Sequence, residues 1–320
     1  MAEKRFSVIV IGRNEGENLQ KCFDSISKVK ETVSVAECIY VDSDSTDQSL
    51  RIANEHVSVD IAIKISGEIN SAVARNVGAD KSTGEILFFV DGDMEICPKF
   101  LEGIWTTDGV ELVHPVITGD MINVIDGEQQ YYYGKPLESD QYTNQNGGLF
   151  IIEHDTWMRI GGMDNRFKRS QDLEFFLRLD LNGIKILRKK EVLCYHYTYQ
   201  YHHQKRIYSA LKSGYQKFSG LLYRINLTKS LVGVKLFLRK DYTAIFLFLN
   251  LIASVIFGIK FFLIYLISVF VRTVAKRGAF LSQLIYQIFS DIYCIYGFLF
   301  FYPKRSKRFL ITLIKPNGTR

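Results

Sequence analysis

Four acidic residues follow apolar runs of the sequence, each near a point where a buried strand is expected to end. They are Glu15, Asp42, Asp91 and Asp93. Because ligands of open parallel α/β sheets bind beyond the carboxyl ends of the strands, these side chains are expected to meet at one edge of a sheet. A crevice lined with carboxylates repels a phosphate ligand unless a divalent cation lies between them.

Asp91 and Asp93 flank Gly92 directly after the apolar run LFFV. On a tight turn, one carboxylate can bind a hard cation while the other orients a water molecule or a ribose hydroxyl. Two carboxylates hold Mg²⁺ or Mn²⁺ weakly, so the oxygens of a bound diphosphate would complete the ligand shell. An isolated Asp-x-Asp is more often a solvated turn, but the buried run before it and the parallel position of Asp42 favour a binding site.

Three common nucleotide and hydrolase motifs are absent from the sequence. The chain has no GxxxxGK[ST] phosphate loop, no GxGxxG after the first apolar run and no GxSxG turn. Ordinary NTPases, dinucleotide-dependent enzymes and serine hydrolases are therefore disfavoured.

Predicted strands and helices alternate over the first part of the chain. Apolar, β-branched runs predict strands at residues 6–11, 37–41, 59–65 and 85–90, and helical spacing predicts helices between them, one at 71–80. After a polar excursion at 118–147, helices are expected at 154–160 and 171–182, and short strands at 184–187 and 191–196. The alternation predicts an α/β sandwich with a mostly parallel central sheet and helices on both faces.

The motifs at these positions resemble, in type and order, those of the family 2 inverting glycosyltransferases, which have the nucleotide-diphospho-sugar transferase (GT-A) fold. The resemblance covers about residues 5–200. Its motifs are FSVIVIGRNE at 6–15, VDSDSTD at 41–47, ARNVG at 74–78, GEILFFVDGD at 84–93, the pair Gly147 and Gly148, GGMD at 161–164 and QDLEFFLRL at 171–179.

The resemblance implies a role for most of the polar residues in these motifs. It implies that the nucleotide is held by residues of several loops: Asn14, Glu15, Asp42, Arg75, Asn76 and Asp91. It implies Mg²⁺ or Mn²⁺ as the cofactor, with Asp91 and Asp93 at the metal, and a nucleotide-sugar donor that we expect to be UDP-linked. The catalytic base of the family falls on Asp172.

Two motifs depart from the family pattern, and one is missing. Ser43, Asp44 and Ser45 stand where Asp-Gly-Ser or Ser-Gly-Ser is common, which adds a carboxylate of unassigned role. Gln171 replaces the Glu of a Glu-Asp pair. The Gln-x-x-Arg-Trp motif of processive members is absent, which disfavours polymer synthesis like that of cellulose synthases.

Asp172 is also a reasonable base on physical grounds. Inversion at an anomeric carbon needs a carboxylate near the acceptor hydroxyl, on the face opposite the departing diphosphate. Asp172 opens a predicted helix, and the positive end of the helix dipole favours its ionised form. The alternative is a simple N-terminal capping residue.

Histidines and tyrosines leave further alternatives open. His196 follows a short predicted strand and is either a third metal ligand, as in some relatives, or a hydrogen-bonded or interfacial histidine. His202 and His203 lie beside Lys205 and Arg206, a composition that suits lipid headgroups or an anionic acceptor. The Tyr run at 131–133 either stacks on acceptor sugars or closes a hairpin.

The charge of the chain is divided between its two parts. Residues 1–200 carry 21 Lys and Arg against 32 Asp and Glu, whereas residues 201–320 carry 19 against 2. The five cysteines are scattered and include no CxxC, which fits a reducing compartment. The apolar run at the N-terminus is too short for a signal peptide, so the first part is expected in the cytosol.

Two long apolar stretches lie in the basic part, at residues 243–271 and 279–302. A membrane span needs roughly 20 apolar residues, so both are long enough to cross. Basic clusters flank both stretches, however, and two crossings would put the middle cluster on the opposite side from the outer two. The alternative is a re-entrant or interfacial pair of helices, with every basic cluster facing anionic lipid. A buried soluble helical domain is disfavoured by the scarcity of acidic residues.

These observations predict three regions: a GT-A domain at 1–200, a basic helical connector at 201–242, and membrane-associated helices with a basic tail at 243–320. We expect an inverting glycosyltransferase at the cytosolic membrane face, acting on a lipid-linked or saccharide acceptor in polysaccharide or glycolipid assembly. The alternatives are transfer to a polyprenyl phosphate and a non-catalytic membrane scaffold that binds nucleotide sugar. Nucleic acid is not expected as a partner, because the basic residues alternate with apolar stretches that are long enough to span a bilayer.

Overall fold

The computed structural model describes residues 4–144, 146–198, 204–229, 231–274, 280–305 and 308–316. The chain divides into two compact units. The sheet unit comprises residues 1–166, 171–198 and 305–320, and the helical unit comprises residues 167–170 and 199–304.

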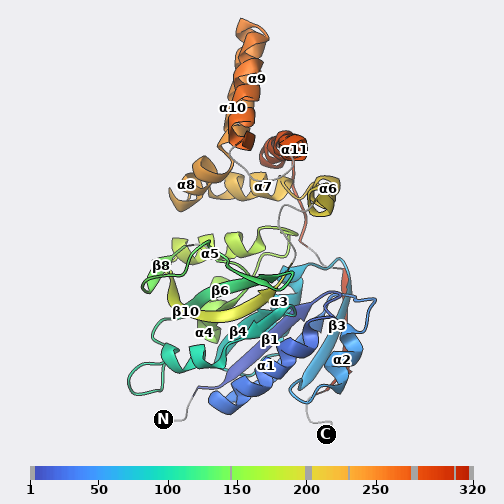
Figure 1. The fold of residues 1–320 in the computed structure, drawn as a ribbon, viewed down its shortest axis with the longest axis vertical. Coiled ribbons are helices and arrows are strands. Elements are labelled where there is room, and N and C mark those ends of the chain that lie inside the picture. Colours follow the sequence, from blue (N-terminus) through green and yellow to red (C-terminus); the bar gives the residue numbers. More distant parts are fainter. Residues whose placement is uncertain are drawn as a thin grey trace. The chain divides into compact units, whose positions relative to one another are not determined.

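The sheet unit is built on one mixed β-sheet (Figure 1). Its strands are β1 (Phe6–Gly12), β2 (Val35–Asp42), β3 (Ile61–Gly67), β4 (Ile86–Asp91), β5 (Met94–Ile96), β6 (Val116–Ile125), β7 (Glu128–Tyr131), β8 (Gln141–Thr143), β9 (Phe150–Glu153), β10 (Ile186–Tyr197) and β11 (Phe309–Lys315). The strand order is β11-β3-β2-β1-β4-β9-β6-β10-β5, with β7 beside β6 and β8 beside β10.

Helices cover both faces of this sheet, so the predicted α/β fold is confirmed. They are α1 (Leu19–Thr32), α2 (Ser49–Glu55), α3 (Ser71–Asp80), the 3₁₀ helix η1 (Pro98–Ile104), α4 (His154–Ile160) and α5 (Gln171–Leu181). One apolar core lies between the sheet and α1, α2 and η1, and the other lies between the sheet and α3, α4 and α5. In the parallel β3-β2-β1-β4 half, the central strands β1 and β4 are almost wholly apolar because both of their faces are buried.

Two expectations for the later strands need correction. The two short strands expected at 184–187 and 191–196 are one strand, β10, whose register on β6 shifts between Arg188 and Val192, so the polar interruption is an irregularity rather than a break. The sheet is mixed rather than mostly parallel, since β9, β5, β7 and β8 run antiparallel to their neighbours.

A larger correction concerns the C-terminal region, which was expected to be membrane helices and a basic tail to residue 320. Phe309–Lys315 is instead β11, which pairs antiparallel with β3 along its length. The run FLITLI has the β-branched, apolar composition of a strand, and β3 would otherwise be the unpaired edge of the sheet. The chain therefore returns to the sheet unit after the helical unit.

The helical unit contains six helices within the part of the chain that the structure describes. They are α6 (Gln204–Ser213), α7 (Lys217–Asn226), α8 (Leu231–Lys240), α9 (Tyr242–Phe257), α10 (Lys260–Val274) and α11 (Phe280–Leu299). The apolar stretch 243–271 is thus two helices rather than one segment, because the chain breaks at Gly258, whose φ is +100°. Among the described residues no single helix has the length and hydropathy of a membrane span, whereas α8 and α9 together reach both, with an 80° bend between them.

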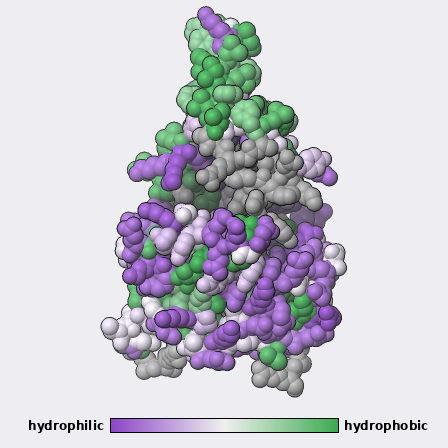
Figure 2. Space-filling model, viewed as in Figure 1, coloured by the Kyte–Doolittle hydropathy of each residue, from purple (hydrophilic) through white to green (hydrophobic). Residues whose placement is uncertain are grey.

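In the last three helices, α9, α10 and α11, polar side chains are buried and apolar side chains are exposed, which is the reverse of the usual pattern in a soluble protein. Polar side chains are buried along their contacts: Thr243, Asn250, Thr273, Gln283, Gln287 and Asp291. Large apolar side chains are exposed around them, among them Val255, Ile259, Ile267, Val271, Leu281 and Phe300. Figure 2 shows a continuous hydrophobic surface over α9 and α10. Exposed apolar surface of this extent indicates a contact with lipid or with another protein.

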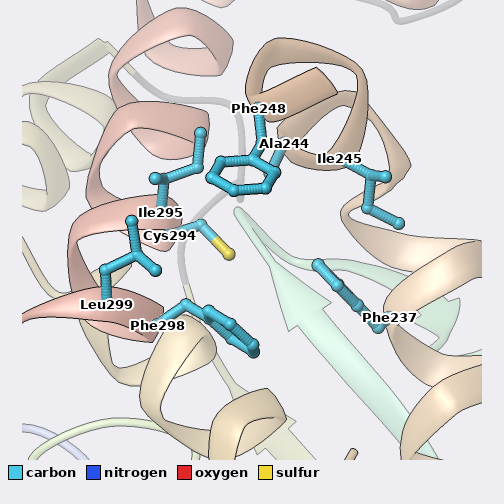
Figure 3. A pocket seen from close by; sticks show the side chains of 8 residues that line it. All are labelled: Phe237, Ala244, Ile245, Phe248, Cys294, Ile295, Phe298 and Leu299. Atoms are coloured by element: carbon cyan, nitrogen blue, oxygen red, sulfur yellow. The ribbon is translucent and has the colours of Figure 1, made fainter. Parts of the chain in front are cut away.

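Two glycines bring α7 and α11 into close contact. A Cβ on Gly220 would lie 1.9 Å from the carbonyl oxygen of Cys294, and a Cβ on Gly297 would lie 1.9 Å from that of Lys217. Beside this crossing, α8, α9 and α11 enclose an apolar cavity of about 170 Å³ (Figure 3). Its lining comprises Phe237, Ala244, Ile245, Phe248, Cys294, Ile295, Phe298 and Leu299.

Candidate active site

Asp91 ends β4 and forms an ion pair with Arg75 of α3. Arg75 Nη2 donates to Asp91 Oδ1 at 2.5 Å, and the Arg75 side chain is buried. Burial raises the pKa of Asp91, the Arg75 charge opposes this shift, and the negative charges of Asp93 and Asp172 raise the pKa further. The predicted residues Arg75, Asp93 and Asp172 therefore all lie close enough to Asp91 to act on its charge.

Gly148 lies against this ion pair. A Cβ at this position would fall 1.9 Å from Arg75 Nη2 and 3.2 Å from Asp91 Oδ2. Its neighbour Gly147 has open space at the same position. Only the second glycine of the pair is therefore required by packing.

Asp93 and His196 are neighbours although they are far apart in sequence. β5 follows Asp93 directly and pairs antiparallel with β10, so that Met94 lies opposite His196. His196 Nε2 is 3.2 Å from Asp93 Oδ2, and His196 Nδ1 is 2.9 Å from Asn123 Oδ1. A neutral ring that donates from Nδ1 to Asn123 turns the lone pair of Nε2 toward Asp93, the arrangement of a metal-binding histidine.

The donor set at Asp93 and His196 fits a divalent cation. Asp93 Oδ1 is buried and has no hydrogen-bond partner among the described residues. A carboxylate oxygen and an imidazole nitrogen suit Mn²⁺, and the carboxylate suits Mg²⁺. Within the described ranges, no group of three or more His, Cys, Asp or Glu side chains is placed to hold a metal ion. Asp91, also predicted at the metal, has its Oδ1 bonded to Arg75.

Glu15 belongs to the same electrostatic cluster. The pKa of Glu15 is raised to about 7, mainly by burial and also by the charges of Asp93, Asp91 and Asp47, while His196 lowers it. Glu15 therefore holds a proton more strongly than an ordinary carboxyl. This shift is the expected result of burying a carboxyl group next to other carboxylates.

Asn14 and Asp42 reach the predicted edge, but their side chains brace the loops after β1 and β2. Asp42 is fully buried and accepts hydrogen bonds from Tyr40 Oη at 3.1 Å and from the Ser45 backbone N–H at 2.8 Å. Asn14 has a φ of +58°, and its Oδ1 accepts from the Thr46 backbone N–H at 2.8 Å. These bonds tie the two loops together.

The extra carboxylate Asp44 and the predicted site residue Asn76 also have structural partners. Asp44 forms an ion pair with Lys64 at 2.8 Å, which lowers the pKa of Asp44. Asn76 Nδ2 donates to the Met163 carbonyl at 2.8 Å, and Asn76 Oδ1 accepts from the Met163 backbone N–H at 2.9 Å. Asn76 thereby fixes the GGMD loop to α3.

Asp172 is the second residue of α5 and is half-buried. It is therefore not the residue that caps this helix. Arg178, in the last turn of α5, ties this helix to the end of α4 and the loop after it, since its guanidinium donates to the carbonyls of Ile160 and Gly162, each at 2.7 Å. The charge of Asp172 raises the pKa of Asp91, so the predicted base lies within electrostatic reach of the Asp-x-Asp turn.

The ring of Tyr133 packs against Arg188, a contact that the sequence did not predict. The Arg188 guanidinium carbon is 3.5 Å from the Tyr133 ring centroid, and Arg188 Nη2 donates to the buried Asp120 at 2.6 Å. Tyr133 remains 44% exposed. Burial raises the pKa of Tyr133, and Asp172 is among the acidic residues that add to this shift. One face of the ring is thus held by the protein close to the predicted base.

Asn123, Asp120 and Arg188 are the site residues that sequence reasoning missed. All three lie on β6 or β10, in the region interpreted as a polar excursion and two short strands. The sequence of β6, VITGDMINVI, does not alternate regularly between apolar and polar residues, so it gave no local signal for these positions. His202 and His203 lie outside the described residues.

Comparison with known proteins identifies the sequence family and the fold. Residues 7–171 match the family model described as "Glycosyl transferase family 2". Among curated proteins, the chain is 28% identical over 181 residues to glycosyltransferase AglE of Haloferax volcanii, a match that covers 55% of this chain and 53% of AglE. The chain spans about half the length of this relative.

Two solved structures share the fold at low sequence identity. The structure of S. aureus TarS 1-349 in complex with UDP-GlcNAc has a TM-score of 0.53 and 20% identity, over 71% of this chain and 68% of that chain. GalNAc-T7 with UDP, GalNAc and Mn²⁺ has a TM-score of 0.50 and 15% identity, over 65% of this chain and 48% of the other.

Proposed function

Because the chain belongs to glycosyl transferase family 2, we propose that it transfers a sugar from a nucleotide-diphosphate donor to an acceptor hydroxyl, with inversion at the anomeric carbon. The observation that carries this proposal is that Asp93 contacts His196 at the sheet edge where β4 ends in Asp91, within electrostatic reach of Asp172 on α5. TarS was solved with UDP-GlcNAc and GalNAc-T7 with UDP, which supports a UDP-linked donor.

Asp93 and His196 would hold Mn²⁺ or Mg²⁺, with Asn123 orienting the histidine. Such an ion, when bound, neutralises the diphosphate that leaves. The Arg75 charge favours the ionised form of Asp91, and its hydrogen bond holds Asp91 in place. The loops braced by Asn14 and Asp42 would line the edge where the nucleotide lies. Mn²⁺ in the GalNAc-T7 structure supports this choice of cofactor.

Asp172 would act as the base. As the acceptor oxygen forms its bond to the anomeric carbon, its proton passes to the Asp172 carboxylate, and the bond from that carbon to the diphosphate oxygen breaks. Tyr133, held on Arg188, is positioned to contact the acceptor.

A membrane setting and a lipid-linked acceptor are the finer parts of the proposal. The inverted polarity of α9, α10 and α11 supports contact with lipid, and the apolar cavity between α8, α9 and α11 has a lining that suits a hydrocarbon chain. All five cysteines are unpaired, which supports a reducing, cytosolic location for the sheet unit. Polysaccharide or glycolipid assembly is the setting that fits these features.

The test uses the purified full chain with a panel of sugar nucleotides, with Mn²⁺ or with chelator. Asp172→Asn should lower transfer by roughly 100-fold or more, the usual contribution of a general base, while donor binding persists. Asp180→Asn, on the same helix, is the matched control and should stay near wild type. Full transfer by Asp172→Asn would refute the base assignment, and with a polyprenyl phosphate as acceptor it would favour the alternative in which the lipid phosphate attacks.

A further inference from the structure

The helices α9 and α10 form a closed hairpin. Leu247 of α9 packs in one cluster with Tyr265 and Val269 of α10. At the base of the hairpin, Arg272 Nη2 donates to the Lys240 carbonyl at 2.5 Å and Arg272 Nη1 donates to Thr243 Oγ1 at 3.1 Å. The last turn of α10 is therefore fastened to the first turn of α9.

Both ends of the helical unit are connected to the sheet unit. β10 precedes it, and β11 follows it and pairs with β3 from Phe309 to Lys315. A hydrogen-bonded sheet cannot be divided between the two sides of a bilayer, because the strands must be in contact. Residues 199–304 must therefore enter and leave a membrane on the same side, which excludes an odd number of crossings.

The hairpin is short for a pair of membrane spans. α9 has 16 residues and α10 has 15, which at 1.5 Å per residue give lengths of about 24 and 22 Å. The hydrocarbon core of a typical bilayer is about 30 Å thick.

The turn of the hairpin is apolar where a turn in water would be polar. Val255 is 88% exposed and Ile259 is 77% exposed, on either side of Gly258. The Gly258 N–H donates to Ser254 O at 3.1 Å, and the Phe262 N–H donates to Ile259 O at 2.9 Å, so these two N–H groups of the turn have partners within the hairpin. Lys260 begins α10, and its long apolar stem can extend its ammonium toward headgroups.

The base of the hairpin has the opposite character. Thr243 Oγ1 donates to Asp291 Oδ1 at 2.9 Å, next to Arg272. α8 is bent by 80° from α9 and ends in Arg239 and Lys240. This arrangement suits a basic helix in the plane of anionic headgroups with an apolar hairpin inserted beneath it.

We propose that α9 and α10 are a re-entrant membrane anchor, which enters the leaflet that faces the sheet unit, turns within the hydrocarbon at Gly258 and returns. The occupant of this apolar surface is the acyl chains of a bilayer. Arg272, the basic end of α8 and the sheet unit all stay on one side, which removes the conflict between the basic clusters and two separate crossings. The inference rests on the membrane association proposed above and not on the transfer reaction.

The experiment measures the accessibility of three cysteines, each introduced separately into the full chain. Ile259→Cys marks the turn, Val57→Cys marks the sheet unit, and Leu310→Cys marks β11, and all three side chains are exposed. The background carries Cys97→Ser, because the other four native cysteines are buried. Sealed right-side-out and inside-out membrane vesicles are treated with a membrane-impermeant maleimide before and after detergent.

We expect Val57→Cys and Leu310→Cys to react in the same vesicle orientation, and Ile259→Cys to react only after detergent. Labelling of Ile259→Cys from the side opposite Val57→Cys would mean that the hairpin crosses, and labelling from the same side would mean that it is not inserted. Either result overturns the anchor, as does recovery of the protein in the soluble fraction. Sugar-donor hydrolysis is assayed in parallel, so that loss of activity with the expected labelling counts only against the proposed function.

Discussion

Replacement of Gly148 by alanine tests whether the Arg75–Asp91 ion pair organises the site. The new Cβ would lie 1.9 Å from Arg75 Nη2 and 2.8 Å from Arg75 Cζ. The guanidinium must move away, and because its side chain is buried it has little room to do so without leaving Asp91.

The magnitude follows from the bond that is lost. A hydrogen bond between charged groups is worth about 1.5–3 kcal/mol, which corresponds to a loss of roughly 10–150-fold in any step that needs Asp91 held in place. We therefore expect kcat/KM for donor hydrolysis to fall by about this factor. Thermal unfolding of the variant should begin several degrees lower, because the added methyl group also overpacks the site.

The matched control is Gly147→Ala, whose Cβ meets open space. Neither glycine has a positive φ, so backbone strain does not separate the two variants. The assay compares donor hydrolysis and Tm of both variants with wild type. Equal activities for Gly147→Ala and Gly148→Ala would refute the reasoning, because the two substitutions differ only in what the methyl group meets.

Three further predictions concern the metal, the acidic cluster and the helical unit. His196→Ala should raise the Mn²⁺ concentration needed for half-maximal activity, and Asn123→Ala should do so by about 10–100-fold, as for other residues that orient a metal ligand; unchanged metal titrations would contradict the proposed site. Because the folded-state pKa of Glu15 is raised from 4.5 to about 7, its contribution to stability is lost as pH rises through that range, by up to about 3 kcal/mol. In chelator, Glu15→Gln should therefore melt above wild type at pH 8 and not at pH 4.5; the same difference at both pH values would exclude this cause. Gly220→Val should separate α7 from α11 and lower the Tm of the helical unit, measured with detergent-solubilised protein, and an unchanged Tm would mean that the helices do not pack this closely.

The parallel half of the fold and the centre of the site could be predicted from sequence, because each has a local signal. Strand β4 is a continuous apolar run that ends in Asp91, two residues before Asp93, and α5 carries Asp172 in its first turn before an apolar helical pattern. Burial on both faces fixes the composition of such strands, so their ends can be located by inspection.

The rest depended on contacts between distant segments, which leave no local signal. Asn123 becomes important only because β6 pairs with β10 beside His196. Asp42 and Asn76 were assigned to the nucleotide by motif, and the structure adds that their polar atoms are bonded within the protein. The break at Gly258 was hidden because the residues on both sides of it are equally apolar.

The pairing of β11 with β3 also sets an order of events during synthesis. Strands β1 to β4 leave the ribosome early, whereas β11 emerges only after the apolar helices, so β3 remains an open edge in the interval. Open edges of this kind are the usual sites of aggregation in nascent chains, and distant strand pairs form slowly. Insertion of α9 and α10 into lipid before β11 arrives would shorten that exposure by returning the last strand to the vicinity of its partner.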